Sequence, residues 1–344
     1  MKEKLTPKII SEYYEKKFPM KQFMSFIGLS DFQNREFGFV VGNNRFVRNI
    51  SFSNTDLLRD FMVKNSVKDA YVGAVFETPP SKETPIQKIK WKFREFIFDL
   101  DIDEYDAYEE KDSKAEDVKE EKLYVGVRTC GCREDKYCRE CWSLIQDAAI
   151  FIDQTMKEDF GFKNIIWIFS GRRGVHGWVR EKITQEFDRN QRRAILDYLT
   201  FIHDPTRTQS IEDIPSEAKP LRNRIYSLIA KSFLIRSTPK ELNQLGISLN
   251  KAREIIKKVN ATEEFDHNKY NILIPDNKLI RKNLSSEIIR KRYPRIDRKV
   301  TMDTNRVSRM PFSVHGKTGQ IAIIIKDLKS FYPVSAPTIW DSLK

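Results

Sequence analysis

The sequence predicts a mixed α/β fold (α+β), with a core formed by residues 1–184 and 291–344 and a helical insertion at 185–290. Strand-length apolar segments recur before residue 184 and again near the C-terminus, whereas 185–290 carries apolar residues at helical spacing. With 344 residues and 40% hydrophobic content, the chain is long enough to bury a sizeable core. We therefore expect a folded, globular protein rather than a disordered one.

The elements before residue 104 follow from their periodicity. The pattern predicts one amphipathic helix at 8–24 and a second helix at 56–64. It predicts strands at 36–41, 46–52 and 70–76 and an acidic strand near 93–103. Residues 104–122 are nearly all charged or small, which is typical of a surface loop.

The second half begins with a helix expected at 142–160, which Gly161 should end. Two strands follow at 165–169 and 175–179. In the insertion, Thr238 and Glu241 flank a Pro in the pattern of a capping box, and Ser248 should cap the next helix. Strand character returns at 295–302 and 321–326.

The charge balance favours an anionic partner. Lys and Arg outnumber Asp and Glu by 61 to 49, for a formal net charge of +12, and nucleic acid is the usual partner of such a chain. A proteome that is basic throughout would give the same excess. Residues 1–7 lack a secretion signal, and the longest apolar runs are too short to span a bilayer. We expect an intracellular, soluble protein with no membrane partner, cytoplasmic if its source is archaeal.

The most informative segment is the acidic strand. Successive side chains of a strand point to opposite faces, so Asp99, Asp101 and Asp103 should project together while the other face stays apolar. Neighbouring anions repel unless a cation lies between them. Carboxylates without a His nearby in sequence suit Mg²⁺ or Mn²⁺, and two such ions can support nucleotidyl transfer. The alternative is a solvent-facing, acidic strand end.

All four cysteines lie in one short segment at 128–142. Cys130, Cys132, Cys138 and Cys141 form a C-x-C-x5-C-x2-C pattern, which matches a closed, tetrahedral Zn²⁺ site. With four protein ligands, this zinc would have a structural role and leave no open position for catalysis. Free or redox-active cysteines are the alternative.

A third segment joins the strands at 165–169 and 175–179. Two glycines permit a tight turn, and the adjacent Arg172 and Arg173 offer forked donors suited to phosphate oxygens. His176 on the outgoing strand could donate to a triphosphate, with Ser170 assisting. An ordinary hairpin with a solvated Arg pair is the alternative.

The last segment brings a candidate third carboxylate, Asp297, from a distant part of the chain. Arg309, His315 and Lys317 follow as further donors for phosphate. By spacing alone, an aspartate such as Asp297 is more often a plain surface residue.

Together, the four segments resemble the small catalytic subunit of archaeal and eukaryotic DNA primases, in the family's order. The resemblance rests on 98–101 (FDLD), 170–179 (SGRRGVHGWV), 295–297 (RID) and 311–315 (PFSVH). It implies a catalytic core distantly related to RNA-recognition modules, with a zinc-binding loop beside it. It also implies Asp99, Asp101 and Asp297 as ligands of Mg²⁺ or Mn²⁺, with Asp103 at most a supporting carboxylate.

The resemblance further implies which side chains contact the incoming nucleoside triphosphate: Ser170, Arg172, Arg173, His176, Arg309, His315 and, by a weaker match, Arg48. The expected activity is that of a nucleotidyltransferase, namely template-directed synthesis of short primers on single-stranded DNA for replication. Initiation needs two nucleotides held at once, so a primase large subunit is the expected partner.

Three other functions fit parts of the sequence. A related primase-like repair polymerase would extend DNA ends, although no fused ligase, nuclease or helicase segment is present. A non-catalytic zinc protein that binds nucleic acid would explain the charge and the cysteines, but not the clustered aspartates. A metal-dependent nuclease would not require so many donors for a triphosphate.

Overall fold

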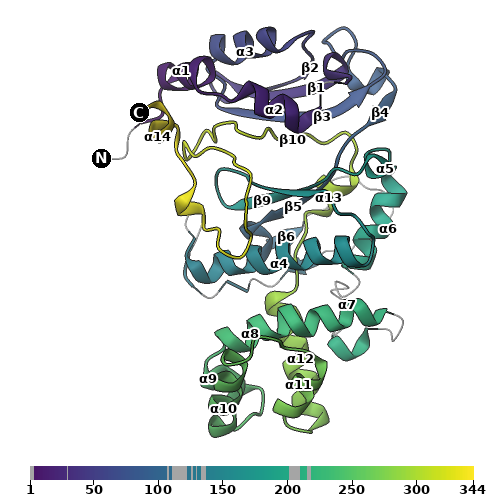
Figure 1. Cartoon of the computed structure of the whole chain (residues 1–344), viewed down its shortest axis with the longest axis vertical. Coiled ribbons are helices and arrows are strands. Elements are labelled where there is room, and N and C mark those ends of the chain that lie inside the picture. The colour runs from purple at the N-terminus through teal and green to yellow at the C-terminus, as the bar shows by residue number, and fades with distance from the viewer. Residues whose placement is uncertain are drawn as a thin grey trace. The chain divides into compact units, whose positions relative to one another are not determined.

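The computed structural model describes residues 4–28, 30–106, 108–110, 122–124, 127–128, 130–132, 137–200, 210–214 and 218–344 (Figure 1). It confirms a mixed α/β fold with antiparallel sheets. The chain forms two compact units. Unit 1 comprises Met1–Asp101, Lys163–Ala194 and Ile296–Lys344, and unit 2 comprises Ile102–Phe162 and Ile195–Arg295. The expected division at 184/185 and 290/291, and the kinship with RNA-recognition modules, stay predictions.

The larger sheet of unit 1 has the strand order β10-β3-β1-β2, and β4 also pairs with β3. Its strands are β1 (Arg35–Val41), β2 (Arg45–Ile50), β3 (Asp69–Phe76), β4 (Trp91–Phe93) and β10 (Ser308–Arg309). The helices α1 (Pro7–Lys16), α2 (Met20–Ile27) and α3 (Thr55–Lys64) lie over one face of this sheet (Figure 1). The predicted strands at 36–41, 46–52 and 70–76 and the helix at 56–64 are thus confirmed to within two residues.

The single helix expected at 8–24 is wrong, because the structure has two helices there. Helix α1 ends at Lys16, and α2 starts after Pro19. Proline has no amide hydrogen and keeps the preceding residue out of the helical region, so an apolar stripe cannot continue through it as one helix.

The two faces of the larger sheet differ in burial. Phe37 and Phe39 alternate on β1 and are fully buried in the apolar core that α1–α3 help to form. Gly38 lies between them in sequence and therefore faces the opposite side, where it is paired with Tyr71 of β3. That opposite side carries the polar residues of the site described below.

The second sheet of unit 1 is antiparallel, with the strand order β5-β9-β8. Its strands are β5 (Phe96–Asp101), β8 (Ile165–Phe169) and β9 (Gly174–Val179), as predicted for 165–169 and 175–179. β8 is apolar throughout, and β5 and β9 are apolar and mostly buried apart from Asp99, Asp101 and His176, which explains why the three strands pair in the interior. The acidic strand is confirmed only as far as Asp101, because Ile102–Tyr105 form a 3-10 turn.

Two further strand predictions near the C-terminus are wrong. Within 295–302, residues Arg298–Met302 form the short helix α13, because the side chain of Asp297 accepts the amide of Val300 at 3.0 Å as an N-cap. Residues 321–326 make only isolated bridges, such as Ile168 with Ile324. Ile321, Ala322 and Ile325 are buried without a regular ladder, whereas Ile324 is exposed. Unit 1 also contains α5 (Lys182–Gln185) and α14 (Ile339–Leu343), and α6 (Arg189–Leu199) begins in it.

Unit 2 is mainly helical in the part of the chain that is described. Its long helix α4 (Arg139–Glu158) matches the helix expected at 142–160. Its other helices are α7 (Lys219–Arg224), continued by a π-helical segment at Ile225–Ala230, and α8 (Lys231–Arg236), α9 (Pro239–Gln244), α10 (Leu249–Asn260), α11 (His267–Leu273) and α12 (Lys278–Arg292). The capping box of Thr238 and Glu241 and the Ser248 cap are both confirmed.

The surface loop expected at 104–122 is wrong where the structure describes it. β6 (Tyr108–Glu110) pairs with β7 (Lys122–Tyr124) as a two-stranded sheet, and the segment between them lies outside the described residues. Cross-strand pairing can form between charged sequences when the register is locally favourable, which composition does not reveal. No helix among the described residues is long and apolar enough to cross a membrane.

Candidate active site

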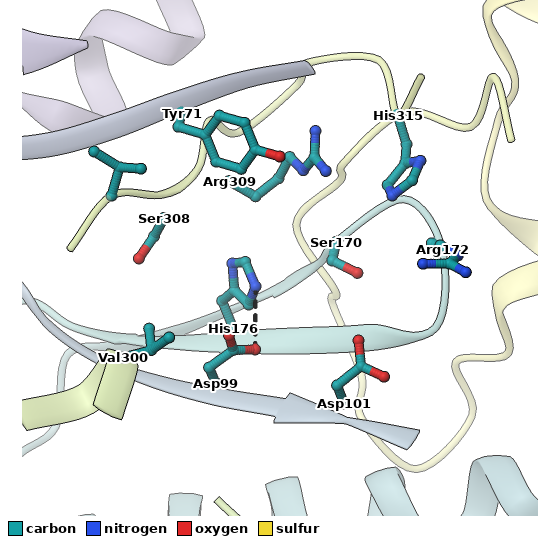
Figure 2. Close-up of a pocket in the computed structure, with 11 residues that line it drawn as sticks. Tyr71, Asp99, Asp101, Ser170, Arg172, His176, Val300, Ser308, Arg309 and His315 are labelled. Atoms are coloured by element: carbon teal, nitrogen blue, oxygen red, sulfur yellow. Dashed lines mark ion pairs between the residues drawn. The ribbon is translucent and has the colours of Figure 1, made fainter. Parts of the chain in front are cut away.

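A cavity of about 170 Å³ opens in unit 1 between the polar face of the larger sheet and the β5–β9 pair (Figure 2). It brings together residues that are far apart in the chain, and five strands or their loops contribute to it. Its lining consists of Tyr71, Asp99, Asp101, Ser170, Arg172, His176, Val300, Val307, Ser308, Arg309 and His315.

Strand pairing aligns the acidic and basic sides of this cavity. In the β5–β9 register, Asp99 lies opposite His176 and Asp101 lies opposite Gly174. Directly opposed residues point to the same face of a sheet, so the side chains of Asp99 and His176 lie next to each other. His176 Nε2 lies 3.3 Å from Asp99 Oδ1 (Figure 2). The pairing also packs the backbone closely, because a Cβ on Gly174 would lie 2.6 Å from the carbonyl oxygen of Leu100. Glycine at 174 is therefore needed for the turn to meet β5.

Asp297 joins the same strand through its backbone. Its amide donates to the carbonyl oxygen of Asp99 at 3.0 Å, while its side chain caps α13 through Val300. Asp297 is not among the lining residues of the cavity. Its Oδ1 accepts the Val300 amide, and a carboxylate has further lone pairs with which to bind a cation.

The pKa values of the acidic residues reflect this crowding. Burial, together with the charge of Asp99, raises the pKa of Asp101 to about 6, although Arg173 opposes the shift. Burial and the charge of Asp99 also raise the pKa of Asp297 above its usual value. Carboxylates that are costly to ionise beside one another are stabilised when a divalent cation binds between them. The donor set, all carboxylate oxygen, fits Mg²⁺ or Mn²⁺.

The turn between β8 and β9 places Arg172 and Ser170 at one end of the cavity, beside His315 (Figure 2). Gly171 adopts a φ of +90°, and a Cβ there would lie 2.8 Å from the Cβ of His315, so only glycine lets the two segments meet. The hydroxyl of Thr318 donates to the carbonyl oxygen of Gly171 at 2.6 Å and thereby ties the turn to the loop that carries His315.

The upper wall is built on β3 and β10. Arg309 donates to Asp69 at 2.6 Å and lies over the ring of Tyr71, 4.8 Å from its centroid. Asp69 also accepts the amide of Gly316 at 3.0 Å, which fixes the loop of His315. Burial, with the nearby Arg309 charge, lowers the pKa of His315 to about 3, so this imidazole is neutral near pH 7.

Besides Asp297, three more residues suggested by the sequence are not among those that line the cavity. Arg173 pairs with Asp101, Nε to Oδ1 at 3.0 Å, but is not among the lining residues. Arg48 makes a two-pronged contact with the buried carboxylate of Glu36, at 2.9 and 2.8 Å, and also donates to the carbonyl of Asn305. Asp103 lies in the 3-10 turn after β5, so it does not continue the row of Asp99 and Asp101 as the alternation predicted.

Several lining residues were not singled out from the sequence. Tyr71 could have been found, because its neighbours Ala70 and Val72 are buried on β3 and alternation places Tyr71 on the other face. Val300, Val307 and Ser308 carried no such signal. They line the cavity because the backbone of α13 and β10 passes it.

The four cysteines lie in unit 2, at the start of α4. Their sulphur atoms are all within 4.8 Å of one another, which suits a tetrahedral metal site. Burial, with the neighbouring sulphurs, raises the pKa of Cys141 to about 12, so four thiolates would not coexist at neutral pH without a cation. Among the residues that the structure describes, this is the one group of three or more His, Cys, Asp or Glu side chains whose ligand atoms all lie within 4.8 Å of one another.

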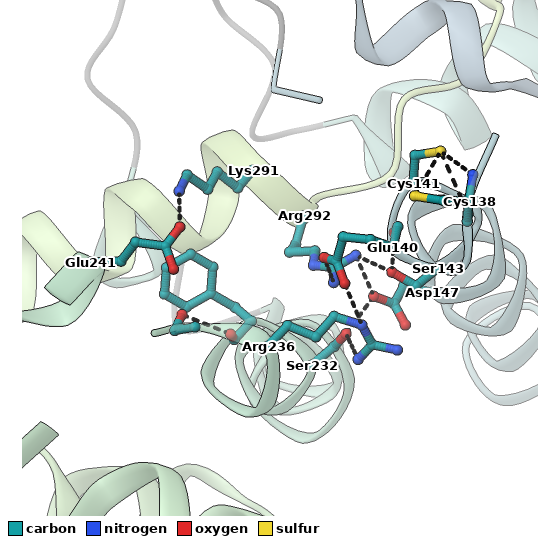
Figure 3. A network of polar contacts seen from close by, with 12 residues as sticks. Cys138, Glu140, Cys141, Ser143, Asp147, Ser232, Arg236, Glu241, Lys291 and Arg292 are labelled. Atoms are coloured by element: carbon teal, nitrogen blue, oxygen red, sulfur yellow. Dashed lines mark hydrogen bonds and ion pairs between the residues drawn. The ribbon is translucent and has the colours of Figure 1, made fainter. Parts of the chain in front are cut away.

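Polar contacts connect the start of α4 with the helices α8 and α12 (Figure 3). Arg292 of α12 donates to Ser143 at 2.8 Å and to Glu140 at 3.2 Å. Asp147 lies 3.3 Å from Arg292 and accepts the hydroxyl of Ser232. The start of α4, where Cys138 and Cys141 lie, is therefore held by the buried Arg292 through its pairs with Asp147 and the more exposed Glu140.

Comparison with known proteins gives one consistent result. The family model for the DNA primase small subunit matches residues 98–327, two thirds of the chain. The matched segment includes every predicted site residue except Arg48.

Individual relatives agree with the family model. The chain is 27% identical to the DNA primase small subunit of Schizosaccharomyces pombe, over 97% of this chain and 76% of that protein. It is 26% identical to that of Saccharomyces cerevisiae, over 96% of this chain and 83% of the relative. It is 28% identical to the DNA primase small subunit PriS of Thermococcus sibiricus, over 93% and 88%.

Proposed function

Because the chain belongs to the DNA primase small subunit family, we propose that the cavity of unit 1 is where it transfers nucleotides. The protein is the catalytic subunit of a primase, a nucleotidyltransferase that makes primers for DNA replication. The observation that carries the assignment of the site is the meeting of Asp99 and Asp101 with Arg172, Arg309 and His315 in one cavity.

The carboxylates are the proposed ligands of catalytic metal ions. Asp99 and Asp101 would hold Mg²⁺ or Mn²⁺, with Asp297 contributing from the segment bonded to β5. When bound, such cations supply positive charge to the attacking 3′-hydroxyl and the leaving oxygen. His176 orients Asp99, and Arg173 orients Asp101, so both carboxylates are held on the cavity side of β5.

The basic end of the cavity is the proposed cradle for the triphosphate. Arg172 offers a forked set of donors, and Ser170 and His315 lie beside it. Because His315 is neutral, it can donate one hydrogen bond without adding charge, while Arg172 and Arg309 balance the negative charge that grows on the departing pyrophosphate. Phosphoryl chemistry of this type needs positioning and electrostatic stabilisation, and no protein nucleophile.

The four cysteines are proposed to bind one structural Zn²⁺. A Cys₄ set fills the tetrahedral coordination of the ion, so its contribution would be to the folding of unit 2. The contacts of Arg292 with Ser143 and Glu140 would then hold the zinc-bearing start of α4 against α12.

The proposed partners follow from the reaction. The substrates are nucleoside triphosphates, and the template is single-stranded DNA, whose phosphates suit the net charge of +12. The described cavity gathers one set of acidic and phosphate-binding side chains, whereas initiation requires two bound nucleotides. We therefore propose that a primase large subunit assembles with this chain.

Incorporation of labelled nucleotides tests the proposal. Wild-type protein with its co-purified partner should make short products on single-stranded DNA without a primer, in the presence of Mg²⁺ or Mn²⁺. The double variant D99A/D101A should make none, while retaining the circular dichroism spectrum of the wild type. Extension of pre-annealed ends with no primer-free synthesis would instead indicate a repair polymerase.

A further inference from the structure

The cavity in unit 1 has a direction. His315 and Arg172 lie at one end, Asp99 and Asp101 lie in the middle, and Ser308 and Val300 lie at the other end (Figure 2). A nucleoside triphosphate has the same order of chemical groups: terminal phosphates, the reacting α-phosphate, then the sugar and the base. With its terminal phosphates at Arg172, its sugar and base lie toward Tyr71, Val300 and Ser308.

The sheet beyond Tyr71 offers an aromatic surface. Phe46 of β2 has 48% of its surface exposed, although it is a large apolar side chain on a sheet whose other face buries Phe37 and Phe39. Its ring meets that of Tyr71 edge to face, with centroids 5.7 Å apart and an interplanar angle of 89°. Tyr71 in turn lines the cavity, and the guanidinium of Arg309 lies 4.8 Å from the centroid of its ring. The aromatic surface is therefore continuous with the nucleotide site.

Glycine at position 38 allows Phe46 to lie this way. The register pairs Gly38 with Tyr71 and Val40 with Phe46, so Gly38, Phe46 and Tyr71 share the face of the sheet that bears Arg309. A Cβ on Gly38 would lie only 3.2 Å from Phe46 Cζ. The ring thus extends over the bare backbone of β1 toward Tyr71, instead of standing away from the sheet.

We infer that Phe46 is a stacking platform for the base of the nucleotide bound in the cavity. This inference rests on the proposed function, because it takes its ligand from the triphosphate site. Every base presents an aromatic face, so a platform of this kind binds any of the four nucleotides and leaves their choice to the template. The exposed phenyl ring lies against Tyr71, which lines the site, so a base that reaches past Tyr71 would cover it.

The test compares two ligands of the full chain. ATP has phosphates, sugar and base, whereas inorganic tripolyphosphate has only the phosphates. F46A should weaken the binding of ATP by about 5- to 150-fold, the range that one base–aromatic stack supplies. The same variant should leave the binding of tripolyphosphate unchanged, and F46W should bind ATP as the wild type does. Isothermal titration calorimetry in Mg²⁺ measures all of these affinities.

Leu57 provides a matched control. It is also 48% exposed, but it belongs to α3 and is not among the residues that line the cavity. L57A should therefore leave both affinities unchanged. The platform is ruled out if F46A binds ATP as tightly as the wild type, or if it loses ATP and tripolyphosphate equally. If the wild type binds neither ligand, the proposed triphosphate site is wrong as well. If R172A weakens the binding of both ligands but F46A weakens neither, the triphosphate site stands and only the stacking platform is wrong.

Discussion

The amide of Asp297 donates to the carbonyl oxygen of Asp99 at 3.0 Å, although the two residues lie in distant parts of the chain. This bond fastens the segment before α13 alongside β5. It places Asp297 beside the strand that carries Asp99 and Asp101, although the segment of Asp297 is not itself a strand. The expected function of all three aspartates depends on this junction, because a cation can be shared only by groups held near one another.

Neutralising the acidic residues should stop nucleotide transfer. D99N and D101N keep the size of the side chain and remove its charge, so we expect at least about a 100-fold loss in the rate of incorporation, with D297N less affected. D103N is the matched control and should stay within a few-fold of the wild type, since Asp103 lies past the end of β5. Full activity in D99N or D101N would contradict the assignment of the metal ligands.

Changing Arg172 should affect the binding of the triphosphate. R172A removes a charge-assisted donor from the basic end of the cavity, so the KM for nucleotides should rise by about 10- to 150-fold. R172K restores the charge without the fork and should recover only part of this loss. Steady-state kinetics measure both, and R189A, an exposed arginine at the start of α6, should behave as the wild type. An unchanged KM in R172A would remove Arg172 from the cradle.

The hydroxyl of Thr318 should matter for the position of that arginine. T318V keeps the shape of the side chain but loses the 2.6 Å bond to the carbonyl of Gly171. One neutral hydrogen bond is worth about 1 kcal/mol, so we expect the nucleotide KM to rise by about 5-fold with little change in kcat. T318S keeps the hydroxyl and should restore the wild-type KM. Since Thr318 acts through the turn, T318V should have no further effect in an R172A background.

The burial of neutral His315 should make the fold sensitive to acid. Its pKa is about 3 in the folded chain and 6.5 when exposed, so between these values the unfolded chain binds the additional proton. The free energy of unfolding should therefore fall as the pH is lowered through 6.5, by at most about 1.4 kcal/mol per pH unit. Denaturant titrations from pH 7.5 to 4.5 measure this slope. H315N cannot be protonated there and should show a shallower slope, and equal slopes would contradict the prediction.

Metal analysis should find one zinc ion per chain. C138S and C141S each remove one sulphur from the group of four, and both should lose zinc and lower the midpoint of thermal unfolding by about 5–10 °C. A strong chelator should produce the same shift in the wild type and none in the variants. A zinc-free wild type that melts as the holoprotein does would show that the four cysteines have another use.

The sequence alone was enough for the local features of this protein. Alternation gave the strands β1, β3 and β5, because a half-buried strand needs apolar side chains at every second position. The spacing of Cys130, Cys132, Cys138 and Cys141 indicated a cluster, since residues so close in sequence have few ways to lie apart. The order of the motifs with Asp99, Arg172 and His315 indicated a resemblance to primase small subunits, and the match of the family model confirms that resemblance.

Tertiary structure decided what no local pattern contains. Residues 295–302 look like a strand, yet Asp297 caps the short helix α13 there, and its amide is bonded to the distant Asp99. Arg48, a predicted nucleotide contact, pairs with the buried carboxylate of Glu36, a partner that no local pattern indicates. The approach of Phe46 to Tyr71 depends on a glycine in the strand between them. In each case the partner comes from another strand or loop, and only the folded chain determines which groups are close enough to interact.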